Sequence, residues 1–260
     1  LEPYQEKVRD WFEKVSLPEI QAEEKPALEV LDLDFSYITG KPILSDIHFR
    51  INKGEMLAIV GKNGAGKSTL SNLICGFIHP DHGKILLNGS DIADKSIKER
   101  GEAIGLVMQN PNQMISKPMI FDEVALGLRV RGVPEEEVKE RVYDKLKICG
   151  LYPFRNWPVS ALSFGQKKRV TIASILVMNP EILILDEPTA GQDYRHYTEI
   201  MEFLKHLNET LGITIIMITH DLGVISRLCD RVVVMYGGKI VEKGEIGEIF
   251  YNTAHPYTKV

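Results

Sequence analysis

Cysteine is scarce in this sequence, and its three copies are widely spaced. Cys75, Cys149 and Cys229 form no C-x-x-C pair and have no metal-ligand spacing. An odd, scattered set of cysteines argues against a disulfide framework or a cysteine metal site. We expect three reduced residues that serve only in packing.

Long apolar runs and an excess of one charge are also missing. The strongest apolar runs, at 182–185, 213–218 and 232–235, are four to six residues long, whereas a membrane-spanning helix needs about 20. The 31 Lys and Arg residues are balanced by 36 Asp and Glu residues, for a net charge of -5. Nucleic-acid phosphates bind basic faces, so this balance argues against nucleic acid as a partner.

The chain divides at about residue 28. Before it, Tyr4, Val8 and Trp11 have the spacing of one amphipathic helix, and the proline- and glutamate-containing stretch 18–26 is typical of a connector. We therefore expect a leader helix and linker over 1–27 and the main domain over 28–260.

Within the main domain, short runs rich in Ile and Val alternate with helical segments. Such runs are typical of strands buried on both faces of a parallel sheet. The strand 56–60 is followed by a Gly-rich loop and a helix, and further helices are predicted over 134–149 and from Tyr197 to Leu211. The pattern predicts an α/β fold with a mostly parallel sheet.

The Gly-rich loop matches the pattern G-x-x-x-x-G-K-[ST]. Glycines let backbone N–H groups approach phosphate oxygens, and the following helix points its positive end at them. Lys67 would reach the β- and γ-phosphates of ATP, and the Ser68 hydroxyl would ligate Mg²⁺. The predicted nucleotide-binding residues of this loop are Gly61, Asn63, Gly64, Gly66, Lys67, Ser68 and Thr69.

Two carboxylates, Asp186 and Glu187, directly follow the apolar run 182–185. Ligands of open α/β sheets bind at the carboxyl ends of strands. Asp186 would help hold Mg²⁺, and Glu187 would polarise or deprotonate the attacking water. Two acids that end a strand are more often a solvated cap, and the phosphate loop is what favours the catalytic interpretation.

A third motif carries a resemblance to a known family. Residues 162–166, Leu-Ser-Phe-Gly-Gln, resemble the LSGGQ signature of ABC ATPases, and the likeness extends over nearly all of 28–250. It implies a P-loop NTPase of ABC type, with a mostly parallel sheet core, an antiparallel β subdomain and an inserted helical subdomain over about 111–165. In the family, the signature of one subunit covers the γ-phosphate bound by the other.

The resemblance therefore assigns Ser163, Gly165 and Gln166 to ATP held by a second domain. Phe164 stands where the family usually has Gly, and it is compatible with function only if its side chain points away from the nucleotide.

Four further residues follow from the resemblance. Gln109 resembles the Q-loop glutamine that senses Mg²⁺ and the attacking water, and His220 resembles the switch histidine that contacts the γ-phosphate. Asp193 resembles the D-loop aspartate at the subunit boundary, and Tyr37 the aromatic residue that stacks on adenine. Without the resemblance, Tyr37 would be interpreted as strand packing.

Within the family, the segments 109–114, 122–128 and 166–170 are most similar to energy-coupling-factor and cobalt-type importers. This implies a transmembrane transporter subunit as partner, a place at the cytoplasmic face of the cell membrane, and a role in powering uptake of a vitamin or metal ion. The stretch from Met114 to Leu128 would receive a helix of the membrane partner.

A second ABC ATPase domain is also implied, in a homo- or heterodimer. One explanation of the leader 1–27 is a tandem polypeptide in which it joins this domain to an upstream ATPase domain. The other is that the leader is a native extension or an artefact. Both explanations stay open.

Two other functions compete. A soluble ABC ATPase acting on nucleic acid or ribosomes would need a basic face or long coiled-coil arms, which the acidic balance and the short insert disfavour. A regulatory domain that no longer hydrolyses ATP would have lost Lys67, Glu187 or His220, and all three are present.

Overall fold

The computed structural model describes residues 26–190 and 194–258 and contains two β-sheets. The main sheet has the order β10-β9-β3-β8-β7-β6, and β9, β3, β8, β7 and β6 run parallel, while β10 pairs antiparallel to β9. Its strands are β3 (Met56–Val60), β6 (Ile104–Val107), β7 (Ile182–Asp186), β8 (Thr214–Thr219), β9 (Arg231–Tyr236) and β10 (Lys239–Glu245).

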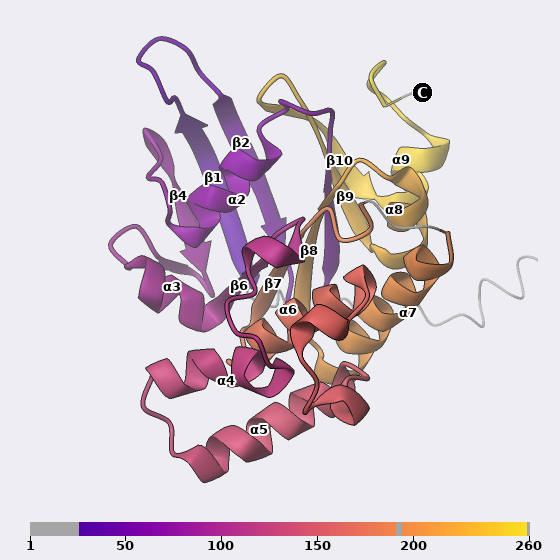
Figure 1. Ribbon diagram of the computed structural model, residues 1–260. Helices are drawn as coiled ribbons and strands as arrows, with labels where there is room; N and C mark the ends of the chain where they lie inside the picture. The colour runs from indigo at the N-terminus through magenta and orange to yellow at the C-terminus, as the bar shows by residue number, and fades with distance from the viewer. Residues whose placement is uncertain (1–25, 191–193, 259–260) are drawn as a thin grey trace, which may run out of the picture.

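The second sheet is antiparallel, with the order β2-β1-β4-β5. Its strands are β1 (Leu28–Phe35), β2 (Leu44–Ile51), β4 (His82–Leu87) and β5 (Ser90–Asp91). It lies at the upper left of the molecule, beside the helix that follows the Gly-rich loop (Figure 1).

The main sheet separates two apolar cores, because successive strand residues point to opposite faces. In β3, Met56, Ala58 and Val60 belong to one core, and Leu57 and Ile59 belong to the other. Both faces are thus covered, which confirms the prediction drawn from the short Ile- and Val-rich runs.

Different elements cover the two faces. α2 (Lys67–Cys75) and the antiparallel sheet pack on one core. The other core receives buried side chains from α4 (Ile120–Val130), α5 (Glu135–Ile148), α6 (Phe164–Leu176), α7 (Tyr194–Leu211) and α9 (Ile246–Tyr251). The remaining helical elements are α3 (Ile97–Ala103), α8 (Leu222–Leu228), η1 (Pro111–Gln113), η2 (Tyr152–Phe154) and η3 (Val159–Ala161).

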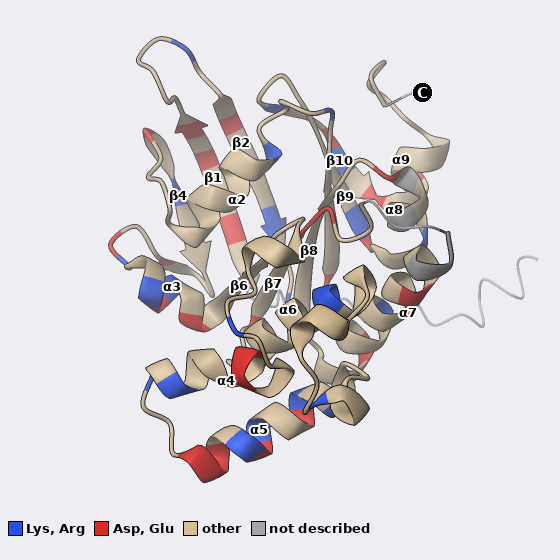
Figure 2. Ribbon diagram, in the orientation of Figure 1, with Lys and Arg blue, Asp and Glu red and all other residues tan. Residues whose placement is uncertain are grey.

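Helices α4 and α5 form the lower lobe in Figure 1. α5 matches the predicted helix 134–149, except that Pro134 is its N-cap and not its first residue. Glu135 and its two acidic neighbours lie at the positive end of the helix, and Lys145 and Lys147 at the negative end (Figure 2). Charge placement and apolar spacing therefore agree on this helix.

The predicted ABC-type α/β fold, with an antiparallel β subdomain, is confirmed. Helices occupy most of the segment 111–165, where the inserted subdomain was expected. The predicted leader lies almost wholly outside the described residues. None of the helices in the described ranges is long and apolar enough to cross a membrane.

Candidate nucleotide site

The predicted site residues meet at one edge of the main sheet because four parallel strands end there. The pairings Val60 with Thr219 and Asp186 with Ile218 align the ends of β3, β8 and β7. β6 ends beside them, with Val107 opposite Leu185. The residues that follow, including Gly61, Gln109, Glu187 and His220, therefore emerge at the same carboxyl edge.

The phosphate loop needs its glycines for backbone conformation and for close approach. Gly64 and Gly66 have φ values of 84° and 100°, in the left-handed region that favours glycine. A Cβ on Gly61 would lie 2.4 Å from the Met235 carbonyl oxygen. Gly66 is also the N-cap of α2 and makes no side-chain cap, so the first N–H groups of this helix have no capping side chain.

Lys67 lies at the start of α2 and folds back over the loop. Its Nζ donates hydrogen bonds to the Gly61 carbonyl at 2.6 Å and to the Lys62 carbonyl at 3.3 Å. Burial lowers the pKa of Lys67, while the nearby carboxylates of Glu187 and Asp186 act in the opposite direction. Around it, Asn63, Gly64 and Ser68 are exposed and Thr69 is buried.

Glu187 is held by both its backbone and its side chain. Its φ is 45°, a left-handed conformation that is strained for a non-glycine residue. Its Oε1 lies 2.8 Å from His220 Nδ1, and its Oε2 accepts a hydrogen bond from Thr219 Oγ1 at 3.2 Å. The structure thus brings together two of the three predicted catalytic residues, Glu187 and His220, and no contact described places Gln109 with them.

Asp186 is half-buried beside Glu187. Burial raises the pKa of the Asp186 carboxyl, the negative charge of Glu187 raises it further, and Lys67 and Lys168 oppose the shift. A carboxylate in this state gains from a nearby cation. Within the described ranges, no three His, Cys, Asp or Glu side chains form a ready metal cage.

Mg²⁺ is commonly held by one or two carboxylates together with substrate phosphates and water. Asp186, with the exposed hydroxyl of Ser68 at the start of α2, supplies this kind of donor set.

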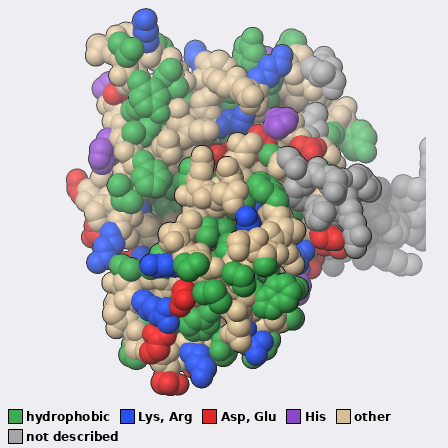
Figure 3. Space-filling model, viewed as in Figure 1, with side chains coloured by type: hydrophobic (Ala, Val, Ile, Leu, Met, Phe, Trp, Pro, Cys, Tyr) green, Lys and Arg blue, Asp and Glu red, His purple; other side chains and the backbone are tan. Residues whose placement is uncertain are grey.

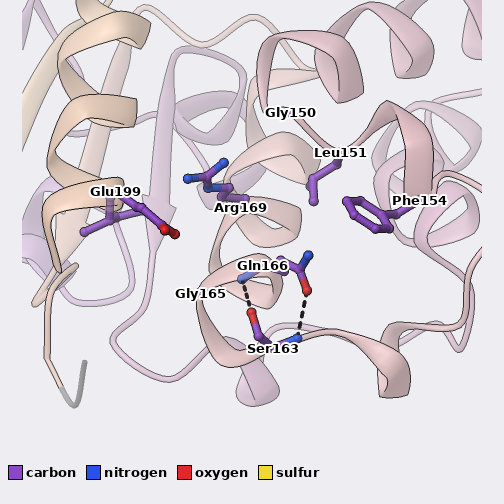
Figure 4. Close-up of a pocket in the computed structure, with 9 residues that line it drawn as sticks. Gly150, Leu151, Phe154, Ser163, Gly165, Gln166, Arg169 and Glu199 are labelled. Atoms are coloured by element: carbon purple, nitrogen blue, oxygen red, sulfur yellow. Dashed lines mark hydrogen bonds between the residues drawn. The ribbon is translucent and has the colours of Figure 1, made fainter. Parts of the chain in front are cut away.

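The signature residues lie at the N-terminus of α6. Ser163 Oγ accepts a hydrogen bond from the Gln166 N–H at 3.3 Å, and Gln166 Oε1 accepts one from the Ser163 N–H at 3.0 Å, which forms a capping box. With Gly165 and Arg169, these residues line a cavity of about 360 Å³ that also reaches Phe154 and Glu199 (Figure 4). None of the hydrogen bonds described joins Ser163, Gly165 or Gln166 to the phosphate loop, and no residue of 61–69 lines this cavity.

Three other predicted residues are placed less closely. Tyr37 is 59% exposed, and its ring lies perpendicular to the ring of Phe35 at a centroid distance of 4.7 Å. Gln109 is exposed just beyond β6. Asp193 lies outside the described residues.

Two residues at the site were not assigned from the sequence. Thr219, fully buried at the end of β8, binds the Glu187 carboxylate. Lys168 is 1% exposed and donates hydrogen bonds to the carbonyls of Glu187 at 2.8 Å and Pro188 at 2.5 Å. Burial lowers the pKa of Lys168 to about 8. The run Lys167-Lys168-Arg169 gives no signal as to which cation is buried.

Comparisons with known proteins agree with the fold and with the motifs found in the sequence. The family model described as ABC transporter matches residues 44–190. A second model, described as an AAA domain of the AbiEii toxin class from type IV toxin–antitoxin systems, matches only 155–226.

Curated relatives carry provisional names as ABC transporter ATP-binding proteins. One from Clostridium perfringens is 59% identical over 94% of this chain and 43% of its own length. One from Enterococcus faecalis is 64% identical over 78% of this chain and 35% of its own length. The chain thus spans less than half the length of these relatives.

A solved structure is also similar. CbiO1 from Clostridium perfringens, described as part of the ABC transporter complex CbiONQ, has a TM-score of 0.84 and is 40% identical, covering 88% of this chain and 92% of its own. As the phosphate loop and the signature predict, this chain belongs to the family of ABC transporter ATP-binding domains.

Proposed function

We propose that this chain binds ATP with Mg²⁺ at the carboxyl edge of the main sheet and hydrolyses it to power transport across a membrane. The proposal rests on the contacts of His220 and Thr219 with the Glu187 carboxylate, at the strand end beside the phosphate loop. A carboxylate fixed in this way is suited to orient and deprotonate water.

The phosphate loop would bind the ATP phosphates. The N–H groups of 61–69 would surround them, and Lys67 would exchange its two carbonyl acceptors for β- and γ-phosphate oxygens. Ser68, Asp186 and Gln109 would hold Mg²⁺, which would neutralise charge on the phosphates. Tyr37, whose side chain is exposed, would stack on adenine.

Glu187 would act as the general base, and the exposed ring of His220 would contact the γ-phosphate. Thr219 keeps one carboxylate oxygen of Glu187 in place. The carboxylate would therefore need little rearrangement to receive the proton of the attacking water.

A second ATPase domain would complete the site. The Ser163 hydroxyl accepts a hydrogen bond within its own turn, so its proton remains available to a phosphate of the other domain, as do the N–H of Gly165 and the side chain of Gln166. Asp193 would lie at the same boundary. The relatives named above have room for a second ATPase domain in the same polypeptide, and we propose that tandem arrangement.

The tandem arrangement predicts that this domain alone is mainly monomeric and hydrolyses ATP slowly. Turnover per site should rise when the complete polypeptide is used. Sizing chromatography and an ATPase assay on both forms test this. A tight homodimer of the isolated domain with full activity would refute the tandem arrangement and leave the ATPase assignment intact.

The membrane partner would dock on the lower lobe, where apolar side chains gather on the face shown in Figure 3. Met114 and Ile115, between η1 and α4, and Phe121 in α4 are only partly buried, and Trp157 is 47% exposed. Phe121 also lines a cavity of about 400 Å³ with Met119 and Tyr143. An apolar surface of this kind suits a helix from a transmembrane subunit.

Similarity to CbiO1 supports a transporter of the energy-coupling-factor type. We propose uptake of a vitamin or metal ion, with this chain at the cytoplasmic face of the cell membrane. Copurification with an integral membrane protein, followed by identification of the ligand of that protein, tests this assignment.

The catalytic proposal is tested by Glu187→Gln in the complete polypeptide. The variant should still bind ATP, and the turnover that depends on this site should fall by about 10²- to 10⁴-fold. Glu181→Gln is the matched control, because Glu181 lies just before the other end of the same strand and its side chain accepts a hydrogen bond only from Asn88 among the contacts described. Near-normal turnover of Glu187→Gln would remove Glu187 from the role of base.

A further inference from the structure

Lys168 is a buried cation that forms no direct ion pair with a carboxylate among the described residues, although the charges of Glu187 and Asp186 act on it. It is one of the largest fully buried side chains, and its ammonium group is satisfied by two backbone carbonyls, those of Glu187 and Pro188. Burying an ammonium group is costly unless its donors are used. An apolar residue of the same size could not donate to these two carbonyls, so the contribution of Lys168 beyond packing is its hydrogen bonds to them.

The two carbonyls belong to the turn that sets the position of the Glu187 side chain. This turn starts in the left-handed conformation of Glu187, and the Glu187 carbonyl also accepts a hydrogen bond from the Ala190 N–H at 3.2 Å. Thr219 and His220 hold the carboxylate itself. Lys168, on α6, therefore stabilises the strained backbone of Glu187, while Thr219, at the end of β8, holds the Glu187 carboxylate.

Phe164 extends this contact to the protein surface. It lies one turn before Lys168 on α6, and its ring centroid is 5.9 Å from the Lys168 Nζ. The negative face of an aromatic ring attracts an ammonium group at this distance. Phe164 is also 40% exposed, so a molecule that packs against the signature segment would touch it. A glycine at this position could make neither contact.

We propose that Lys168 is a positioning residue for Glu187, and that Phe164 makes the position of Glu187 sensitive to what docks on the signature of the same domain. This rests on the proposed function, in which a second ATPase domain covers that signature. Docking at one ATP site would then tune hydrolysis at the other through Phe164, Lys168 and the carbonyl of Glu187.

The main test is Lys168→Met, which keeps the length of the side chain and removes its donors. In the complete polypeptide, the KM for ATP should stay within about twofold, and the turnover that depends on Glu187 should fall by about tenfold to hundredfold, as expected for a misplaced catalytic group. Lys168→Arg should restore most of it. Native-state hydrogen exchange should become faster at Ala190 and remain unchanged within β7.

Lys205→Met is the control, because Lys205 is an exposed α7 lysine that makes only a 3.9 Å ion pair with Glu209 among the described contacts. If Lys168→Met does not fold, Phe164→Leu and Phe164→Gly decide the question at the surface. Both should lower turnover severalfold with unchanged KM and melting temperature. Unchanged turnover in these variants, or in a folded Lys168→Met, would overturn the inference.

The proposed function fails separately, if Glu187→Gln keeps its turnover. Loss of turnover in Glu187→Gln together with full turnover in Lys168→Met would refute only the role of Lys168.

Discussion

Arg100 on α3 should be among the most costly residues to remove, although it is not one of the residues at the carboxyl edge of the main sheet. It is 2% exposed, and its guanidinium donates hydrogen bonds to the carbonyls of Leu73 at 2.9 Å and Ile74 at 3.3 Å, at the C-terminus of α2. It also reaches the carbonyls of Lys95 and Ala93. A cation at this end of a helix is favourable, and α2 carries Lys67 and Ser68 at its other end.

The magnitude follows from these contacts. A hydrogen bond to a charged group is worth about 1.5–3 kcal/mol, and a buried acceptor left without a partner costs about 1–3 kcal/mol. Leu73 keeps another partner, the Gly76 N–H, so the four contacts do not add in full. We expect Arg100→Met to lower the free energy of unfolding by about 3 kcal/mol, which is about 6–12 °C in melting temperature for a domain of this size.

The assay is thermal and urea unfolding of Arg100→Met beside Arg131→Met. Arg131 is an exposed residue at the end of α4 that donates a similar bond to the Gly127 carbonyl at 3.3 Å, so its loss should change the free energy of unfolding by less than about 0.5 kcal/mol. Arg100→Lys, which keeps the charge but not the fork of donors, should recover only part of the loss. Equal shifts for Arg100→Met and Arg131→Met would refute the reasoning.

Three other predictions follow from the described geometry. Tyr37→Ala should weaken ATP binding by about 1–3 kcal/mol while Tyr37→Trp is tolerated, and equal affinities by calorimetry would leave Tyr37 as strand packing. Phe121→Asp should uncouple transport from hydrolysis while ATP binding is kept. Unchanged transport in vesicles would show that the membrane partner does not dock on this surface. Burial raises the pKa of all three thiols from 9.0 to about 12, so they should resist alkylation at pH 8 until the protein unfolds. Because these folded-state pKa values are raised, the thiols stabilise the fold below pH 9 and lose that contribution between about pH 9 and 12. Alkylation of the native protein at pH 8, or a free energy of unfolding that does not change between pH 9 and 12, would contradict the raised pKa values.

The sequence predicted most reliably what depends on backbone pattern. The strands followed from runs of Ile and Val buried on both faces, and α5 followed from its apolar spacing and its acidic first turn. The meeting of the site residues at one edge could be predicted next, because parallel strands point their carboxyl ends to the same edge of a sheet. Glu187 and His220 meet there although 33 positions separate them along the chain.

Two residues that the sequence could not predict, Arg100 and Lys168, are cations with carbonyl partners. Arg100 and Lys168 sit in segments rich in charge, Lys98-Glu99-Arg100 and Lys167-Lys168-Arg169, where each would be expected on a solvated face. Their partners are backbone atoms distant in sequence, such as the carbonyl of Leu73 or of Glu187. Backbone acceptors carry no residue type, so no motif marks these contacts.

Charged side chains lie at the carboxyl edge of the main sheet, whereas the two cores consist of apolar side chains. Burial lowers the pKa of Lys67 and Lys168 and raises that of Asp186, so in each case the charged form is less stable in the fold than in water. Burial of these three charged groups therefore carries a desolvation cost in the folded domain. Phosphate oxygens beside Lys67 and a cation beside Asp186 would relieve it. Binding of ATP with Mg²⁺ would then stabilise the domain both by new contacts and by offsetting this desolvation cost. The stabilisation should be greatest at the strand ends where Glu187 is held.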